Sequence, residues 1–142
     1  MKTIIATLVF AVSTFVLSAQ TEIKTETNGT TVTVTVPVPS NKGTVYAVLH
    51  SENTFMKDGG VEVNSDVKDA IATITFENVT PGTYAVLLFL DTNGNKKMDF
   101  EPNGMPAEMY GASNNVMSFG PPMWSDAKFE VANEPVAIEI RL

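Results

Sequence analysis

Alternation of valine with threonine is the feature that most constrains the fold of this chain. Residues 31 to 36 read Thr-Val-Thr-Val-Thr-Val, which places the valines on one face of an extended strand and the threonines on the other. The same period of two returns at residues 70 to 76 and 136 to 142. Beyond the first nineteen residues no stretch shows a convincing helical period. The sequence therefore predicts an all-β protein.

About seven strands are expected, separated by turn residues at short intervals. The run at 45 to 49 is apolar on both faces and is predicted to lie centrally in a sheet. Such a pattern indicates an antiparallel β-sandwich. The strands are expected at residues 21–27, 30–38, 45–49, 70–76, 83–90, 127–131 and 136–142, with a further short strand around 61–63.

Two turns carry specific predictions. Asn28-Gly29 is a strong hairpin signal, because both central positions of the turn need positive φ, and a two-residue turn there would pair Ile23 with Val34. Pro81-Gly82 is typical of a type II turn, in which glycine takes the positive φ. This turn would lead into the strand at 83–90.

The first nineteen residues have the pattern of a secretory signal peptide. Lys2 is followed by an apolar run from Ile4 to Leu17 and by the small residues Ser18 and Ala19. The run is too short to span a membrane comfortably. We therefore expect residues 1–19 to be a signal peptide, residues 20–142 to form one domain, and the protein to be exported to the periplasm or the extracellular space without membrane insertion.

Charge and composition exclude several classes of function. Sixteen acidic and nine basic residues give a net charge of −7, which disfavours binding to nucleic acid or to anionic lipid. The chain has no cysteine, which removes thiol catalysis and zinc-thiolate sites. His50 is the one histidine, no Gly-x-Ser-x-Gly pattern accompanies it, and it is expected to be a surface residue at a strand end.

A calcium loop is predicted directly after the strand at 83–90. Asp91, Asn93 and Asn95 would offer side-chain oxygens, Lys97 its backbone carbonyl, and Asp99 a direct or water-mediated oxygen. The loop departs from the EF-hand pattern, since its twelfth position is a proline that cannot supply the bidentate carboxylate. Asparagine, aspartate and glycine also favour ordinary turns, so a polar hairpin tip is the alternative.

The closing ligand of this loop must then come from elsewhere in the chain. Glu101 is the nearer candidate and Glu108 the more distant one. Glu108 has two further interpretations, as a solvated carboxylate or as an acceptor for backbone donors. Calcium is the expected cofactor, and it would stabilise the domain.

Residues 91 to 125 form an unusually long connection with no period. The segment carries too many methionine and aromatic side chains for a solvated linker, so it is expected to be an ordered loop packed on one end of the sandwich. A ligand surface for a protein, peptide or glycan is predicted within it, made of Tyr110, Asn114, Asn115 and Trp124. Trp124 has an alternative role as a hydrophobic plug.

Two other functions remain open. Five methionines between residues 98 and 123 could bind soft copper, although adaptable packing residues have the same composition. A hydrolase would need a pair of carboxylates, and the acidic residues available for it are Asp91, Asp99, Glu101, Glu108 and Asp126. The leading hypothesis is a calcium-stabilised accessory or binding module.

Several motifs in fixed order carry a family resemblance. Residues 41 to 142 resemble the domain of unknown function 2141, a family of small exported bacterial proteins, in the segments 76–86, 91–95, 104–115 and 126–129. The resemblance implies an immunoglobulin-like or transthyretin-like β-sandwich. It implies no activity.

Overall fold

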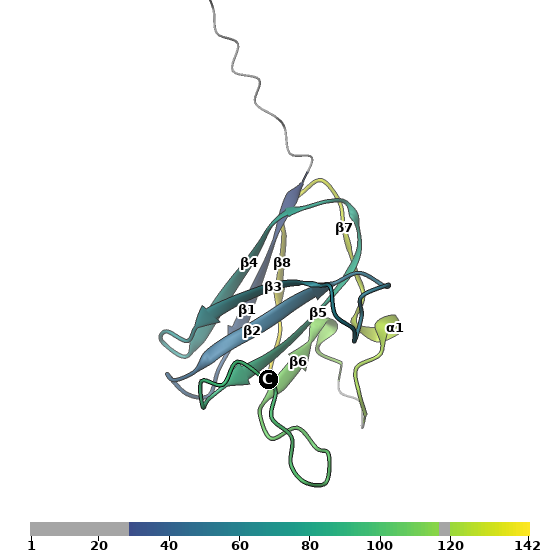
Figure 1. Cartoon of the computed structure of the whole chain (residues 1–142). Coiled ribbons are helices and arrows are strands. Elements are labelled where there is room, and N and C mark those ends of the chain that lie inside the picture. The colour runs from purple at the N-terminus through teal and green to yellow at the C-terminus, as the bar shows by residue number, and fades with distance from the viewer. Residues whose placement is uncertain (1–28, 117–119) are drawn as a thin grey trace, which may run out of the picture.

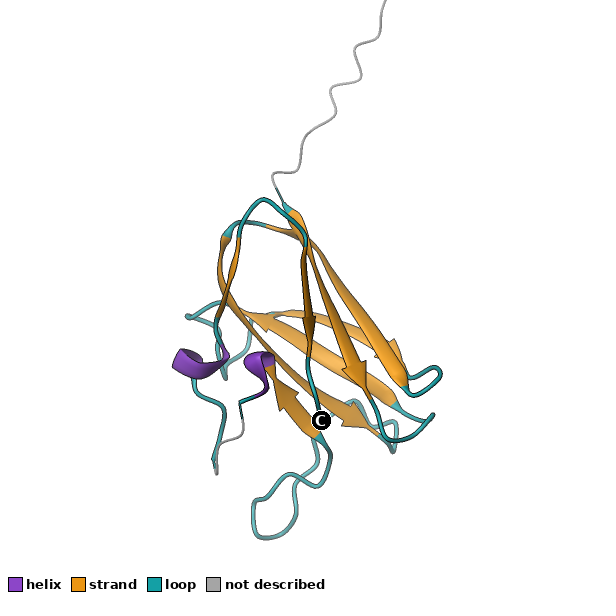
Figure 2. Ribbon diagram, turned by 180° about the vertical axis from the view of Figure 1, so that it is seen from behind, coloured by secondary structure: helices purple, strands orange, loops and turns teal. Residues whose placement is uncertain are grey.

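The computed structural model describes residues 29–116 and 120–142, and in that part of the chain the protein is a β-sandwich with two very short helical turns (Figures 1 and 2). The predicted signal peptide and the strand expected at 21–27 lie outside the described residues. The elements are β1 (Thr30–Pro37), β2 (Thr44–His50), β3 (Val61–Asp66), β4 (Ile71–Val79), β5 (Gly82–Asp91), β6 (Tyr110–Ala112), η1 (Ser113–Asn115), α1 (Trp124–Ala127), β7 (Phe129–Val131) and β8 (Val136–Glu139).

Two sheets form the layers of the sandwich. One has three strands in the order β4-β1-β8, and the other has five, with β3-β2-β5-β6 in order and β7 also paired to β5. The all-β prediction is confirmed, and β2 and β5 are central strands as expected. The doubtful strand around 61–63 exists and extends to Asp66 as β3. No helix among the described residues is long and apolar enough to span a membrane.

The alternating strand β1 lies in the middle of the smaller sheet. Its valines at 32, 34 and 36 have no exposed surface, and the threonines between them are half-buried. Val34 pairs with Ile74 of β4 on one side and with Ile138 of β8 on the other. Both edges of β1 are thus occupied, and Ile23, the predicted partner of Val34, lies outside the described residues.

One prediction about local geometry is wrong, and the antiparallel sandwich contains one parallel strand pair among the described residues. The pairing of β1 with β8 is parallel, which alternation in a single strand cannot indicate. Gly82 does not take the positive φ of a type II turn but begins β5, while Asn78 adopts φ 56° just before the turn. Asn78 lies within β4, where the register with β1 shifts between Thr30 and Val32, and asparagine tolerates the left-handed conformation of such a bulge.

The long connection after β5 contains secondary structure of its own. Residues 110–112 form β6, which pairs with Leu87 to Phe89 of β5 and widens the larger sheet, and η1 follows directly. The backbone of the C-terminal segment passes close to β6, since a Cβ on Gly111 would lie 2.5 Å from the Arg141 carbonyl oxygen. The segment is therefore partly an extension of the sheet instead of one continuous loop.

Core packing predicts that substituting two isoleucines on β4 will change the free energy of unfolding by very different amounts. Ile74 is 1% exposed between the sheets, whereas Ile71 on the same strand is 45% exposed. We expect Ile74→Ala to lower the free energy of unfolding by about 2–5 kcal/mol, because it leaves a cavity. Ile71→Ala should change it by less than about 0.5 kcal/mol. Urea unfolding of both variants measures the difference, and equal effects would contradict this placement of the core.

His50 is buried, contrary to the expected surface position. Its side chain is 6% exposed at the end of β2, lies edge-on to Phe55 with ring centroids 6.0 Å apart, and its Nδ1 has no hydrogen-bond partner. Burial lowers the pKa of His50, and the Thr54 backbone opposes this only in part. The apolar partners come from the segment after β2, which the strand pattern alone did not place there.

The buried histidine predicts a stability that depends on pH. Because its folded-state pKa is lower than its unfolded-state pKa, its contribution is complete above the unfolded-state pKa and is lost as the pH falls from that value through the folded-state pKa. The free energy of unfolding should therefore decrease between about pH 8 and about pH 5. In His50→Gln this decrease should be smaller, as measured by urea unfolding at each pH. An unchanged pH dependence would show that His50 does not cause it.

Candidate cation loop and apolar groove

The Asp91 carboxylate organises the loop that follows β5. The side chain is 2% exposed, and its Oδ1 accepts the backbone N–H groups of Asn93 at 3.2 Å and Gly94 at 2.7 Å. Its Oδ2 accepts the N–H of Lys96 at 2.8 Å. Burial alone would raise the pKa of Asp91, but the bonds from these backbone donors more than compensate and hold it below its ordinary value. The carboxylate is thus kept ionised inside the turn.

Two asparagines connect this turn to Asp99. The oxygen of Asn93 accepts the N–H of Asn95 at 3.0 Å, and the oxygen of Asn95 accepts the N–H of Lys97 at 2.9 Å. Their amide nitrogens both donate to the Asp99 carboxylate, at 2.6 Å from Asn93 and at 2.8 Å from Asn95. Alternate polar side chains therefore converge on one point, as the sequence pattern predicts.

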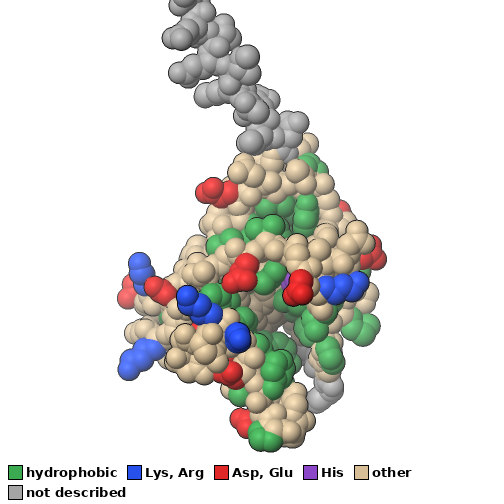
Figure 3. Space-filling view, viewed as in Figure 1, with side chains coloured by type: hydrophobic (Ala, Val, Ile, Leu, Met, Phe, Trp, Pro, Cys, Tyr) green, Lys and Arg blue, Asp and Glu red, His purple; other side chains and the backbone are tan. Residues whose placement is uncertain are grey.

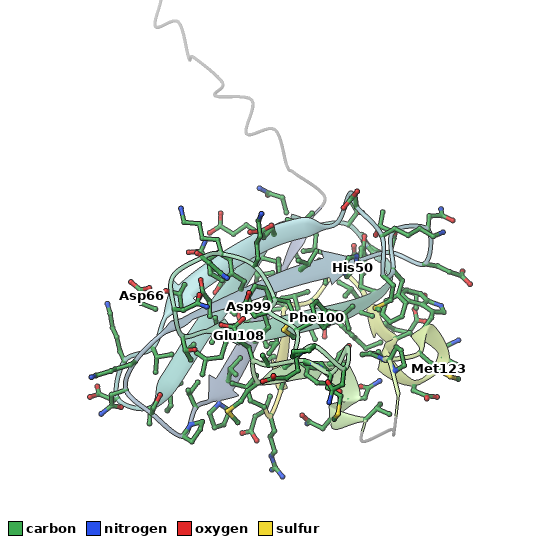
Figure 4. All side chains as sticks on the ribbon, turned by 60° about the horizontal axis from the view of Figure 1, so that its bottom comes forward. His50, Asp66, Asp99, Phe100, Glu108 and Met123 are labelled. Atoms are coloured by element: carbon green, nitrogen blue, oxygen red, sulfur yellow. The ribbon has the colours of Figure 1, made fainter. Side chains whose placement is uncertain are left out.

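Glu108, which lies just before β6, closes the loop that begins at Asp91. Its side chain is 8% exposed, with Oε1 accepting the N–H of Thr92 at 3.1 Å and Oε2 accepting the N–H of Asp99 at 3.4 Å (Figure 4). Of the two predicted closing residues, the structure thus brings Glu108 to the loop. Glu101 is exposed and lies in a separate tight turn, in which its N–H donates to the Met105 carbonyl at 2.7 Å.

The resulting cation loop, made of Asp91, Asn93, Asn95, Asp99 and Glu108, carries uncompensated negative charge. Within the described residues the one ion pair joins Arg141 to Glu139, so none of its three carboxylates is paired with a basic side chain. No group of three acidic or histidine side chains there is close enough to hold a metal unaided. The amides of the two asparagines are therefore part of any oxygen donor set at this loop.

An apolar groove lies beside this loop on the outer face of the larger sheet. Its floor has one row that crosses the strands from Tyr46 to Phe89 to Tyr110, since residues directly opposite in antiparallel strands share a face. The rings of Tyr46 and Phe89 stack with centroids 5.5 Å apart. A second row pairs Val48 with Leu87. These side chains point away from the sandwich core.

Three loop segments, at Met56, at 98–106 and at 120–122, form the walls of the groove, and hydrophobic side chains gather around the hollow (Figure 3). The volume is about 730 Å³, within the range of ligand-binding pockets. Met105 at 62% and Phe100 at 63% exposure are among the most exposed apolar side chains of the protein. The lining residues are Tyr46, Val48, Met56, Leu87, Leu88, Phe89, Met98, Phe100, Gly104, Met105, Pro106, Tyr110, Gly111, Gly120, Pro121 and Pro122.

The cation loop and the groove share one stretch of backbone. The Asp99 side chain lies in the loop, whereas its neighbours Met98 and Phe100 line the groove. The carbonyl of Asp99 also accepts the N–H of Ala107 at 2.8 Å, which closes the wall segment at its base. The position of the wall therefore depends on the anchoring of Asp99.

Of the four residues predicted as a ligand surface, Tyr110 lines the groove. The Asn114 amide donates to the carbonyls of Asp126 and Lys128 at 2.8 and 2.9 Å, and the Asn115 side chain bonds the backbone of Glu139. Both amides thus tie loops together.

Trp124 lies apart from the groove. It is partly buried in a small cluster with Ala85, Ala112 and Ala127, and its ring centroid is 5.5 Å from that of Phe55. This placement agrees with the plug that the sequence left as an alternative.

The groove floor was not recognised as a site in the sequence. The run containing Tyr46 is apolar on both faces, a pattern that predicts a central strand and does not by itself indicate an exposed apolar face. A sandwich covers only one face of each sheet, so large apolar residues on the second face are themselves a signal of a binding surface. Two of the loop methionines, Met98 and Met105, line that surface. Asp126 lies in α1, apart from the cation loop.

Comparison with protein-family models assigns the chain to a family. The model of the family described as uncharacterized proteins conserved in bacteria (DUF2141) matches residues 18–139, nearly the whole length, and the protein belongs to this family. The resemblance seen in the sequence is thereby confirmed. Neither the curated proteins nor the solved structures include a significant match.

Proposed function

We propose that this protein is an exported, non-catalytic module that binds apolar side chains of a peptide in the groove, with calcium stabilising the adjacent loop. The groove is the observation that carries the proposal. Most monomeric proteins bury side chains like Phe89 and Leu87, and an exposed concave apolar surface marks an interaction site.

A peptide suits this groove better than a rigid small molecule. Its walls carry Met56, Met98 and Met105, and methionine is flexible and polarizable enough to fit different partners. Tyr46 and Tyr110 add rings with a polar tip, which serve mixed apolar and polar contacts. A groove with flexible methionine walls and a flat aromatic floor can accommodate the varied side chains of a peptide.

Calcium is supported by the chemistry of the loop donors. Three carboxylates and two amide oxygens lie around one turn with no basic partner, and calcium prefers such oxygen ligands. An amide oxygen that accepts one N–H retains a second lone pair. When bound, the ion would supply positive charge and hold Asp91, Asp99 and Glu108 together. Export rests on the signal-peptide pattern of residues 1–19.

Catalysis has less support than binding. Asp91 and Glu108 are the most buried carboxylates, and both accept backbone N–H groups that hold them in place. A general acid or base has to reach a substrate directly. Their bonds to the backbone therefore support a role in shaping the loop more than a role in a reaction.

The groove predicts a specific loss of binding in one methionine variant. Met105→Asp places a charge in the groove wall and should weaken binding of a short leucine-rich peptide at least about tenfold, by about 1.4 kcal/mol. Met123→Asp is the matched control, because Met123 is 57% exposed and does not line the groove. Fluorescence anisotropy with a labelled peptide measures both affinities. Equal affinities of the two variants would refute the groove as the binding surface.

The cation loop predicts stabilisation by calcium. At a concentration about 100 times its Kd, calcium should add about 2.7 kcal/mol, which raises the melting temperature of a domain this size by roughly 10 °C. A chelator should reverse the rise, as followed by thermal unfolding.

Variants of two glutamates test which carboxylate takes part. Glu108→Gln should remove most of the calcium effect, because Glu108 closes the loop. Glu101→Gln should retain it, since the Glu101 side chain is exposed in a separate turn. A melting temperature that does not respond to calcium in the unaltered protein would rule out the ion.

A further inference from the structure

The border of the groove carries more acidic than basic groups. Glu62 pairs with Val48 and Asp66 with Thr44, so both carboxylates stand on the same outer face as the groove floor. Both residues are exposed on β3, which pairs with β2 alone among the described strands. Glu101 is exposed and directly follows Phe100, which lines the groove. We call Glu62, Asp66 and Glu101 the acidic rim.

Basic groups near the groove are offset by acidic neighbours. Lys57 follows the groove residue Met56 and is itself followed by Asp58. Lys96 and Lys97 precede Met98 in the cation loop, where three carboxylates (−3), these two lysines (+2) and a bound calcium ion (+2) would leave a net charge of +1, against −3 on the acidic rim. The rim therefore keeps an excess of negative charge, in agreement with the net charge of −7 for the chain.

We infer that the peptide bound in the groove is basic as well as apolar, with lysine or arginine side chains set against the acidic rim. This inference rests on the proposed function and adds the chemistry of the partner. Its apolar side chains would occupy the row formed by Tyr46, Phe89 and Tyr110, and its cations would lie at the border, where Glu62 is nearest to the floor.

Charge also decides against other occupants. A second copy of this chain carries the same negative charge and would be repelled at the rim. A fatty acid would bring its carboxylate to the same acidic border. A cationic group beside aromatic rings gains both from the carboxylates and from the ring faces.

Three peptides of equal length test the inference. Each alternates leucine with one other residue, which is lysine, serine or glutamate, and each is labelled for fluorescence anisotropy with the full protein. We expect the lysine peptide to bind at least about tenfold more tightly than the serine peptide, with the glutamate peptide weakest. The advantage of the lysine peptide should shrink as salt is raised, because the rim is exposed.

Two charge reversals separate the rim from the overall charge. Glu62→Lys should weaken binding of the lysine peptide several-fold and strengthen that of the glutamate peptide. Glu77→Lys is the matched control, since it makes the same change of charge at an exposed position of β4 in the other sheet. It should have a much smaller effect on both peptides.

The outcomes distinguish the two levels of the proposal. If all three peptides bind equally, or if both reversals act equally, the basic partner is ruled out while the groove remains a binding site. If none of the peptides binds, the proposed function fails together with the inference.

Discussion

The loop side of the larger sheet depends on one buried anion, the carboxylate of Asp91. It accepts three backbone N–H groups within five residues and turns the chain sharply at the end of β5. That turn carries Asn93 and Asn95 to Asp99, and Glu108 then joins the two ends of the excursion. Because Met98 and Phe100 flank Asp99, the groove wall stands where this polar network holds it. The polar network of the cation loop and the apolar groove are thus structurally coupled.

Much of the fold can be predicted from local sequence patterns, whereas the pairing of strands that are distant in sequence cannot. Alternation in β1 determines which side chains face the core, and Val32, Val34 and Val36 are indeed fully buried. The same alternation carries no information about partners, which is why the pairing with β4 and the parallel pairing with β8 were not foreseen. Strand partners are chosen by contacts between distant segments, and a local pattern does not contain them.

In the candidate site, too, local features could be predicted from the sequence and long-range contacts could not. The spacing of Asp91, Asn93, Asn95 and Asp99 predicts their convergence, because alternate residues of an extended turn lie on one side. The contribution of Glu108 could be named as an option but not selected, since only the return of the chain through β6 brings it back to Thr92. Three strands, β2, β5 and β6, and three loop segments together form the groove, and no single segment of sequence contains it.

The C-terminal segment passes close over Gly111 and brings the two layers of the sandwich together there. Gly111 belongs to β6 in one sheet, whereas Arg141 follows β8 of the other, and any side chain at position 111 would strike its carbonyl oxygen. A methyl group inserted there would act as a wedge between the layers, directly beside Tyr110 at the border of the groove. Because Gly111 has no Cβ, β6 can pack against the C-terminal segment, and this packing sets the position of one side of the groove.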